Sequence, residues 1–224
     1  MAQPHISKEE LRHDAFQDSM HEGLEFLQKH LRYVIIGVVA VVVIVGAGIG
    51  YYAYLQRTAQ QESAAFGAAE KILSAPGTAT KEERIKQTAT AVEGFLKEHP
   101  GSRLAPTAYI YLARFAFELK DYPTADANYQ KALADSHLEP VQKAIVLLSL
   151  GKLRIAQGKP MEAQAFFDQV SDKRFEDAKA YAMGTANLAA GKADDARKQF
   201  QIAATAQPSS SITGWAKDAL DFLP

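Results

Sequence analysis

The sequence predicts an all-α chain, in which a single transmembrane helix is followed by an α-solenoid of short helical hairpins. Three observations support this prediction. Alanine is frequent and β-branched residues run together only between Val34 and Val45, which favours helix elsewhere. Residues 33–55 carry no charge. Three segments of the C-terminal half resemble one another at intervals of 38 and 33 residues, as the units of stacked repeat proteins do.

Composition and charge exclude several classes of function. The chain of 224 residues has a formal net charge of −1 and lacks a dense cluster of Lys and Arg, so we expect no nucleic-acid partner. It contains no cysteine, which excludes disulfides, thiolate zinc sites and cysteine nucleophiles. Its length suffices for a membrane segment and one domain of about 170 residues.

Residues 33–55 (YVIIGVVAVVVIVGAGIGYYAYL) predict the transmembrane helix. As a helix they would extend about 34 Å, enough for a hydrocarbon core of about 30 Å. Tyrosines at both ends of the run suit the two membrane interfaces. Because 32 residues precede the run and it is longer than the apolar part of a signal peptide, we expect an uncleaved anchor.

The charges that flank the anchor predict its orientation. Lys29 and Arg32 precede it closely, whereas only Arg57 follows before Lys71, so the positive-inside rule places the N-terminus in the cytoplasm. Residues 1–32 would then form a cytoplasmic arm, an amphipathic helix whose apolar face lies on the inner leaflet or against a partner helix. The alternative is an exposed helical stub that only supplies the topogenic charge.

Gly46 and Gly50 form a small-residue pair of the GxxxG type within the anchor. Such a pair lets two transmembrane helices approach closely, so a homodimer packed through this face is one interpretation. The other is that glycines are common in membrane helices and that the spacing is a chance match.

The C-terminal half repeats a pattern of two helices joined by a tight turn. In each copy the first helix carries a small residue. The second carries a small residue, an aromatic four positions later and a further residue three positions beyond. Small residues allow a close helix crossing, and the aromatic fills the gap between hairpins. These positions are Ala113, Ala125, Tyr129 and Ala132, then Gly151, Ala163, Phe167 and Val170, then Gly184, Ala196, Phe200 and Ala203.

This pattern resembles the tetratricopeptide repeat, which has a period of about 34 residues and ends in a proline, here Pro208. The first two copies depart from it, because they open without a tryptophan and His137 stands at the expected proline of the first. The resemblance assigns residues 56–224 to a tetratricopeptide-repeat-like domain. It comprises a degenerate first repeat (56–103), repeats at 104–138, 139–172 and 173–208, and a capping helix (209–224).

No motif predicts an enzyme. The sequence lacks a nucleophile elbow, a His-Glu-x-x-His zinc motif, a Walker loop and a calcium loop. Asp194 and Asp195 suit a helix N-terminus rather than a catalytic pair, because adjacent helical residues point about 100° apart. We therefore expect no catalytic residue, no cofactor and no metal.

In tetratricopeptide proteins the first helices of the repeats line a concave face, and the resemblance implies a protein-binding groove here. Its lining would be largely apolar with two basic residues, which suits an amphipathic helix or an unfolded segment. The asparagine–lysine clamp that grips C-terminal carboxylates in some relatives is missing. Alternatively, some of these residues pack against the N-terminal or capping helix. The implied positions are Ile110, Arg114, Phe117, Glu118, Leu148, Lys152, Ile155, Tyr181, Thr185 and Leu188.

The whole layout is similar to that of the ancillary subunit family of the bacterial Sec translocon. The resemblance implies a non-enzymatic protein of the bacterial inner membrane with a periplasmic domain, which assists protein export. Its partners would be translocon subunits and periplasmic chaperones. Because fold alone does not determine function, two other interpretations stay open. One is a general envelope scaffold, in cell division or outer-membrane assembly. The other is a sensor that couples the domain to the cytoplasmic arm.

Overall fold

The structure of the chain, a computed structural model, describes the backbone of residues 8–206 and 210–223 and the side chains of residues 29–206 and 210–223. These residues form helices and no strand, which confirms the all-α prediction. The apolar face expected of the arm before Lys29 and the role expected of Pro208 lie outside the described residues. The chain divides into two compact units, Met1–Ala59 and Gln60–Pro224, which are described separately.

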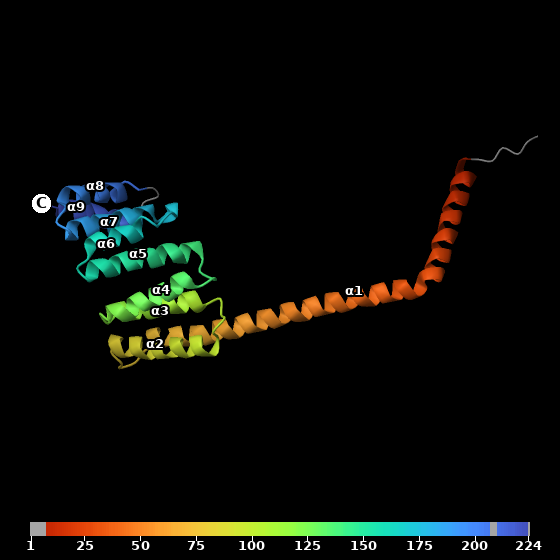
Figure 1. The fold of residues 1–224 in the computed structure, drawn as a ribbon, viewed down its shortest axis with the longest axis horizontal. Coiled ribbons are helices and arrows are strands. Elements are labelled where there is room, and N and C mark those ends of the chain that lie inside the picture. Colours follow the sequence, from red (N-terminus) through yellow and green to blue (C-terminus); the bar gives the residue numbers. More distant parts are fainter. Residues whose placement is uncertain (1–7, 207–209, 224) are drawn as a thin grey trace, which may run out of the picture. The chain divides into compact units, whose positions relative to one another are not determined.

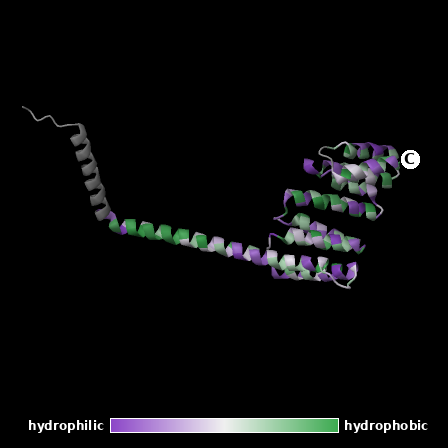
Figure 2. Cartoon of the chain, turned by 180° about the vertical axis from the view of Figure 1, so that it is seen from behind, coloured by the Kyte–Doolittle hydropathy of each residue, from purple (hydrophilic) through white to green (hydrophobic). Residues whose placement is uncertain are grey.

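The helix α1 runs from Lys8 to Ser74, so its first part forms the described residues of the first unit and its last residues belong to the second. Every side chain between Tyr33 and Leu55 is exposed, and Figure 2 shows this stretch coloured as hydrophobic. This helix is long and apolar enough to cross a membrane, and none of its most apolar window is buried. Gly46 and Gly50 have open space where a Cβ would stand, so their packing against a second helix stays a prediction.

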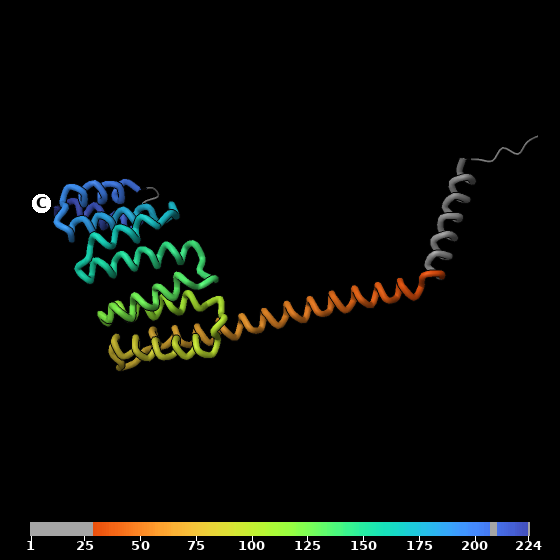
Figure 3. Tube along the Cα trace, in the orientation of Figure 1, coloured from red at the N-terminus to blue at the C-terminus, as the bar shows by residue number. Residues whose placement is uncertain are grey.

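The second unit is a stack of helix pairs, in which successive hairpins follow one another in chain order (Figures 1 and 3). The end of α1 is followed by α2 (Lys81–Glu98). Three hairpins come next: α3 (Ala105–Glu118) with α4 (Tyr122–Ala134), α5 (Pro140–Ala156) with α6 (Pro160–Phe167), and α7 (Glu176–Ala189) with α8 (Ala193–Ala204). A short 3₁₀ helix, η1 (Lys173–Phe175), leads into α7, and α9 (Ser211–Asp221) follows α8.

The three hairpins turn in the same way. In each turn one residue has a left-handed backbone conformation, namely Lys120 (φ 60°), Gly158 (φ 74°) and Gly191 (φ 74°). The residue after it donates its N–H to the carbonyl five positions earlier, over 2.8–2.9 Å, which closes the helix C-terminus in a Schellman motif. Glycine adopts this conformation freely, whereas Lys120 must adopt it with a side chain.

The crossings within the second and third hairpins need glycine. A Cβ at Gly151 would stand 2.7 Å from Phe167 Cδ1 and closer to Cε1 and Cζ, and a Cβ at Gly184 would stand 2.6 Å from Phe200 Cδ1. Both phenylalanines are buried. Each phenylalanine therefore packs on the glycine of its own hairpin, and Phe167 also belongs to a core cluster with Ala182 of the next hairpin.

The core is a chain of clusters, each of which joins a helix pair to its neighbour, as expected of a stacked repeat. Phe66 and Ala69 of α1 pack with Phe95 of α2 and Leu112 of α3. The next two clusters link α3 and α4 to α5, and α5 and α6 to α7. The last cluster joins α7, α8 and α9 through three alanines, with Ala216 as the contribution of α9.

One element ends earlier than the sequence pattern indicates. The pattern places Val170 on the second helix of its hairpin, as Ala132 and Ala203 are on theirs, but α6 ends at Phe167. Val170 instead lies in the connection that leads to η1, although its side chain still packs in the core. The early end of α6 makes room for a pocket described below.

Candidate functional site

Four of the residues expected in the groove line one pocket between α3 and α5. Arg114, Phe117 and Glu118 come from α3 and Lys152 comes from α5. Tyr129 of α4 and Ser149 of α5 complete the lining, and the pocket has a volume of about 260 Å³. The structure thus brings together parts of two repeats that are more than thirty residues apart in sequence.

The other expected groove residues are more enclosed. Ile110 and Leu148 expose only 8% of their surface and belong to the core. Ile155 is half-buried against the cluster that includes Leu148. These side chains therefore present little surface to a ligand.

The three expected positions on α7 lie at the C-terminal end of the stack. The ring of Tyr181 packs on Phe200, with centroids 5.5 Å apart, and on Trp215 of α9, with centroids 6.2 Å apart. Thr185 donates its hydroxyl to the carbonyl of Tyr181 over 2.9 Å. Leu188 remains 43% exposed. Among these three, Leu188 offers the open apolar surface.

The electrostatics of the pocket between α3 and α5 are dominated by cations. Glu118 accepts from Lys81 of α2 over 2.6 Å, so its charge is matched. Arg114 and Lys152 are exposed and form no ion pair within the described residues. Burial raises the pKa of Tyr129, while its hydrogen bond with Ser149 and the charge of Arg114 act in the opposite direction. The pocket therefore combines a neutral phenol with two unmatched positive charges.

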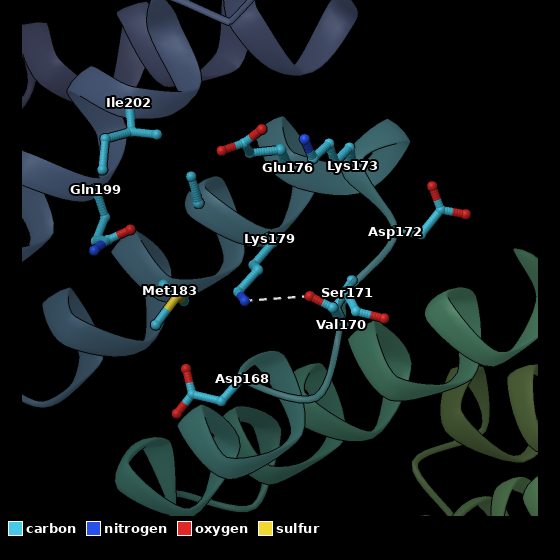
Figure 4. Close-up of a pocket in the computed structure, with 11 residues that line it drawn as sticks. Asp168, Val170, Ser171, Asp172, Lys173, Glu176, Lys179, Met183, Gln199 and Ile202 are labelled. Carbon is cyan, nitrogen blue, oxygen red and sulfur yellow. Dashed lines mark hydrogen bonds between the residues drawn. The ribbon is translucent and has the colours of Figure 1, made fainter. Parts of the chain in front are cut away.

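A second and larger pocket, of about 460 Å³, lies between the connection after α6 and helices α7 and α8. Figure 4 shows its lining, with Asp168 on one side, Gln199 and Ile202 of α8 on another, and Met183 between them. Lys179 donates to the carbonyl of Val170 over 3.2 Å (Figure 4). None of the residues expected in the groove lines this pocket.

The second pocket is of mixed charge, and part of that charge is already paired. Asp172 accepts from Arg174 over 2.7 Å, and these hydrogen bonds hold the pKa of the carboxyl group below its usual value. Glu176 and Met183 lie about half a turn around α7 from Tyr181 and Thr185. The second pocket is therefore on the other face of α7 from the expected groove.

Comparison with protein families matches residues 25–222 to the tetratricopeptide repeat-like domain. The match covers most of the chain and includes the apolar stretch 33–55 as well as helices α2 to α9. The chain belongs to the tetratricopeptide repeat-like family. Comparisons with curated proteins and with solved structures gave no match.

Tetratricopeptide repeat-like domains are in general non-enzymatic protein-interaction modules, and the expectation of such a fold is confirmed. The finer assignment of groove residues stays a prediction. Within the residues that the structure describes, no group of three His, Cys, Asp or Glu side chains is arranged to hold a metal ion.

Sequence reasoning missed two residues, Ser149 and Ile145, on the side of α5 that carries Lys152. Tyr129 packs in the core as expected and also reaches the pocket between α3 and α5. Ser149 lines the same pocket. Ile145 of α5 is 38% exposed and lies one helical turn before Ser149 and two before Lys152. The signal was the spacing 145, 149 and 152, a helical stripe that shares Lys152 with the expected stripe of Leu148, Lys152 and Ile155.

Proposed function

We propose that this chain is a non-enzymatic, membrane-anchored protein-interaction module that assists protein export at the translocon and passes exported chains to chaperones. The observation that supports this best is the extent of the family match, which covers both the exposed apolar stretch and the repeat-like domain. A protein of this kind binds its partners beside a membrane, where exported chains emerge.

In this proposal residues 33–55 span the bacterial inner membrane once, with the N-terminus in the cytoplasm and the repeat-like domain in the periplasm. The domain consists of the repeats at 56–103, 104–138, 139–172 and 173–208 and the cap at 209–224. Residues 56–65 separate the span from Phe66, the first core residue of the domain. Even fully extended, ten residues reach only about 35 Å, so the domain stays close to the membrane surface.

The groove on α3, α5 and α7 would hold the exported chain. Half-exposed apolar side chains on this face, such as Ile145 and Leu188, suit an amphipathic or unfolded segment. Such contacts are individually weak and are not selective for one sequence, as transient handover requires.

Site-specific photocrosslinking in cells tests the role at the translocon. A photoreactive residue at Gln56 or Gln61, next to the proposed span, should capture subunits of the translocon that mass spectrometry identifies. The same probe at Lys217 on α9 should not, because that exposed position is at the far end of the repeat stack in sequence. If the probe at Gln56 instead captures cell-division or outer-membrane assembly proteins and no translocon subunit, that result would favour the scaffold and refute the export role.

The proposed topology has a separate test. Alkaline phosphatase fused after Leu223 should be active, since the enzyme folds only after export. A cytoplasmic β-galactosidase fused at the same position should be inactive. The reverse result, or a mature protein that begins after about Gly50, would refute a periplasmic domain held by an uncleaved anchor.

A further inference from the structure

The pocket between α3 and α5 carries two positive charges that face solvent on the open side of the groove. Arg114 is on α3 and Lys152 is on α5, so two adjacent repeats contribute one cation each. The acidic residue of the pocket, Glu118, is already engaged by Lys81 over 2.6 Å. A guanidinium and an ammonium group are therefore left to meet an external anion.

The rest of the lining fits a carboxylate that is carried on a polypeptide. Tyr129 and Ser149 offer hydroxyl groups, and Phe117 offers an apolar wall. The pocket volume of about 260 Å³ leaves room for one acidic side chain and its stem. A nucleic acid would need a longer row of cations than these two residues supply.

We propose that this pocket receives the side-chain carboxylate of an aspartate or glutamate in the segment that the groove holds. Arg114 would donate to it with its planar fork and Lys152 would act as a point charge. The inference rests on the proposed function, because it requires that the groove binds polypeptide. It adds a selection rule, since segments that combine apolar and acidic residues bind and segments with lysine at the same place are rejected.

Fluorescence anisotropy with designed peptides tests this rule on the full-length protein in a neutral detergent. Three labelled amphipathic probes share the same leucines and have blocked ends, and they differ only in a central pair of Glu, Gln or Lys residues. The Glu probe should bind about five- to tenfold more tightly than the Gln probe, and the Lys probe should bind most weakly. The preference should shrink as salt is added, because exposed charges are screened.

Variants on one helix provide a matched control. Lys152→Glu should abolish the preference for the Glu probe, because the new carboxylate offsets the charge of Arg114 and leaves the pocket without an unmatched cation. Lys143 is also exposed on α5, and nine residues of helix place it about 180° around from Lys152. Lys143→Glu makes the same change in net charge and should leave the order unchanged. Circular dichroism checks that both variants fold.

The outcomes separate the two proposals. Equal binding of the Glu and Gln probes would overturn the acidic selection and leave the groove in place, whereas no binding of any probe would also overturn the proposed function. Equal loss of preference in Lys143→Glu and Lys152→Glu would assign the effect to net charge and overturn the pocket. A version of the Gln probe with a free C-terminal carboxylate provides one more comparison. If it binds as tightly as the Glu probe, the assignment to a side-chain carboxylate is overturned.

Discussion

Replacing Gly151 by alanine should destabilise the repeat stack, although alanine is the better helix former. Glycine in a helix interior is unfavourable by about 0.5–1 kcal/mol relative to alanine, so the substitution gains that amount locally. The added Cβ would stand 2.7 Å from Phe167 Cδ1, and nearer to two other ring atoms, whereas carbon atoms prefer about 3.5–4.0 Å.

The phenylalanine ring has little freedom to move away. Phe167 is fully buried and packs in a cluster with Leu147, Ala163 and Ala182 from three helices. Overpacking of a core typically destabilises by about 1–3 kcal/mol. Contacts this short belong to the upper part of that range, about 2–3 kcal/mol, which leaves a net loss of about 1–2 kcal/mol after a helix gain of about 1 kcal/mol. For a protein of this size the melting temperature should fall by about 2–8 °C.

Thermal unfolding of the full-length protein in detergent, followed by circular dichroism, measures this shift. Gly94→Ala is the matched control, because Gly94 lies inside α2 with no atom within 4 Å of its added Cβ. That variant should raise the melting temperature by about 1–4 °C. Phe167→Leu should destabilise the Gly151→Ala variant less than it destabilises the wild type, because the smaller side chain relieves the clash with the added Cβ. A Gly151→Ala variant as stable as the wild type would refute the close crossing.

Two other substitutions test single features of the domain. Lys120→Gly should stabilise it by about 0.5–1 kcal/mol, because a side chain disfavours the left-handed conformation found there, and a lower melting temperature would contradict the common turn geometry. Tyr129→Phe should reduce the slope with which the free energy of unfolding falls at alkaline pH. The folded-state pKa of Tyr129 is raised, so its contribution is complete below the unfolded value of about 10 and disappears as pH rises through the folded value. Denaturant unfolding between pH 8 and 11 measures the slope, and an unchanged slope would show that Tyr129 titrates alike in both states.

The features that depend on short stretches of chain could be predicted from the sequence. Residues 33–55 contain no charged residue, and the free energy of transferring such a run into lipid is a sum over its own residues. The close helix crossings at Gly151 and Gly184 were also foreseeable, because a hairpin brings its own two helices together. The tight turns have a similarly local origin, because Gly158 and Gly191 readily adopt the left-handed backbone conformation found there.

Only the tertiary structure decided which of the groove residues are open. Helical periodicity locates a face only to within about one residue, or about 100°. An error of one residue is enough to confuse the buried Leu148 with its neighbour Ser149, which lines the pocket. Likewise, the pairing of Glu118 with Lys81 joins helices that are far apart in sequence, and it is this pairing that leaves Arg114 and Lys152 unmatched. Local pattern thus determined the long apolar helix and the hairpins. Burial and ion pairing depend on which side chains are neighbours in space. The form and charge of the candidate site therefore followed from the stacking of one hairpin on the next.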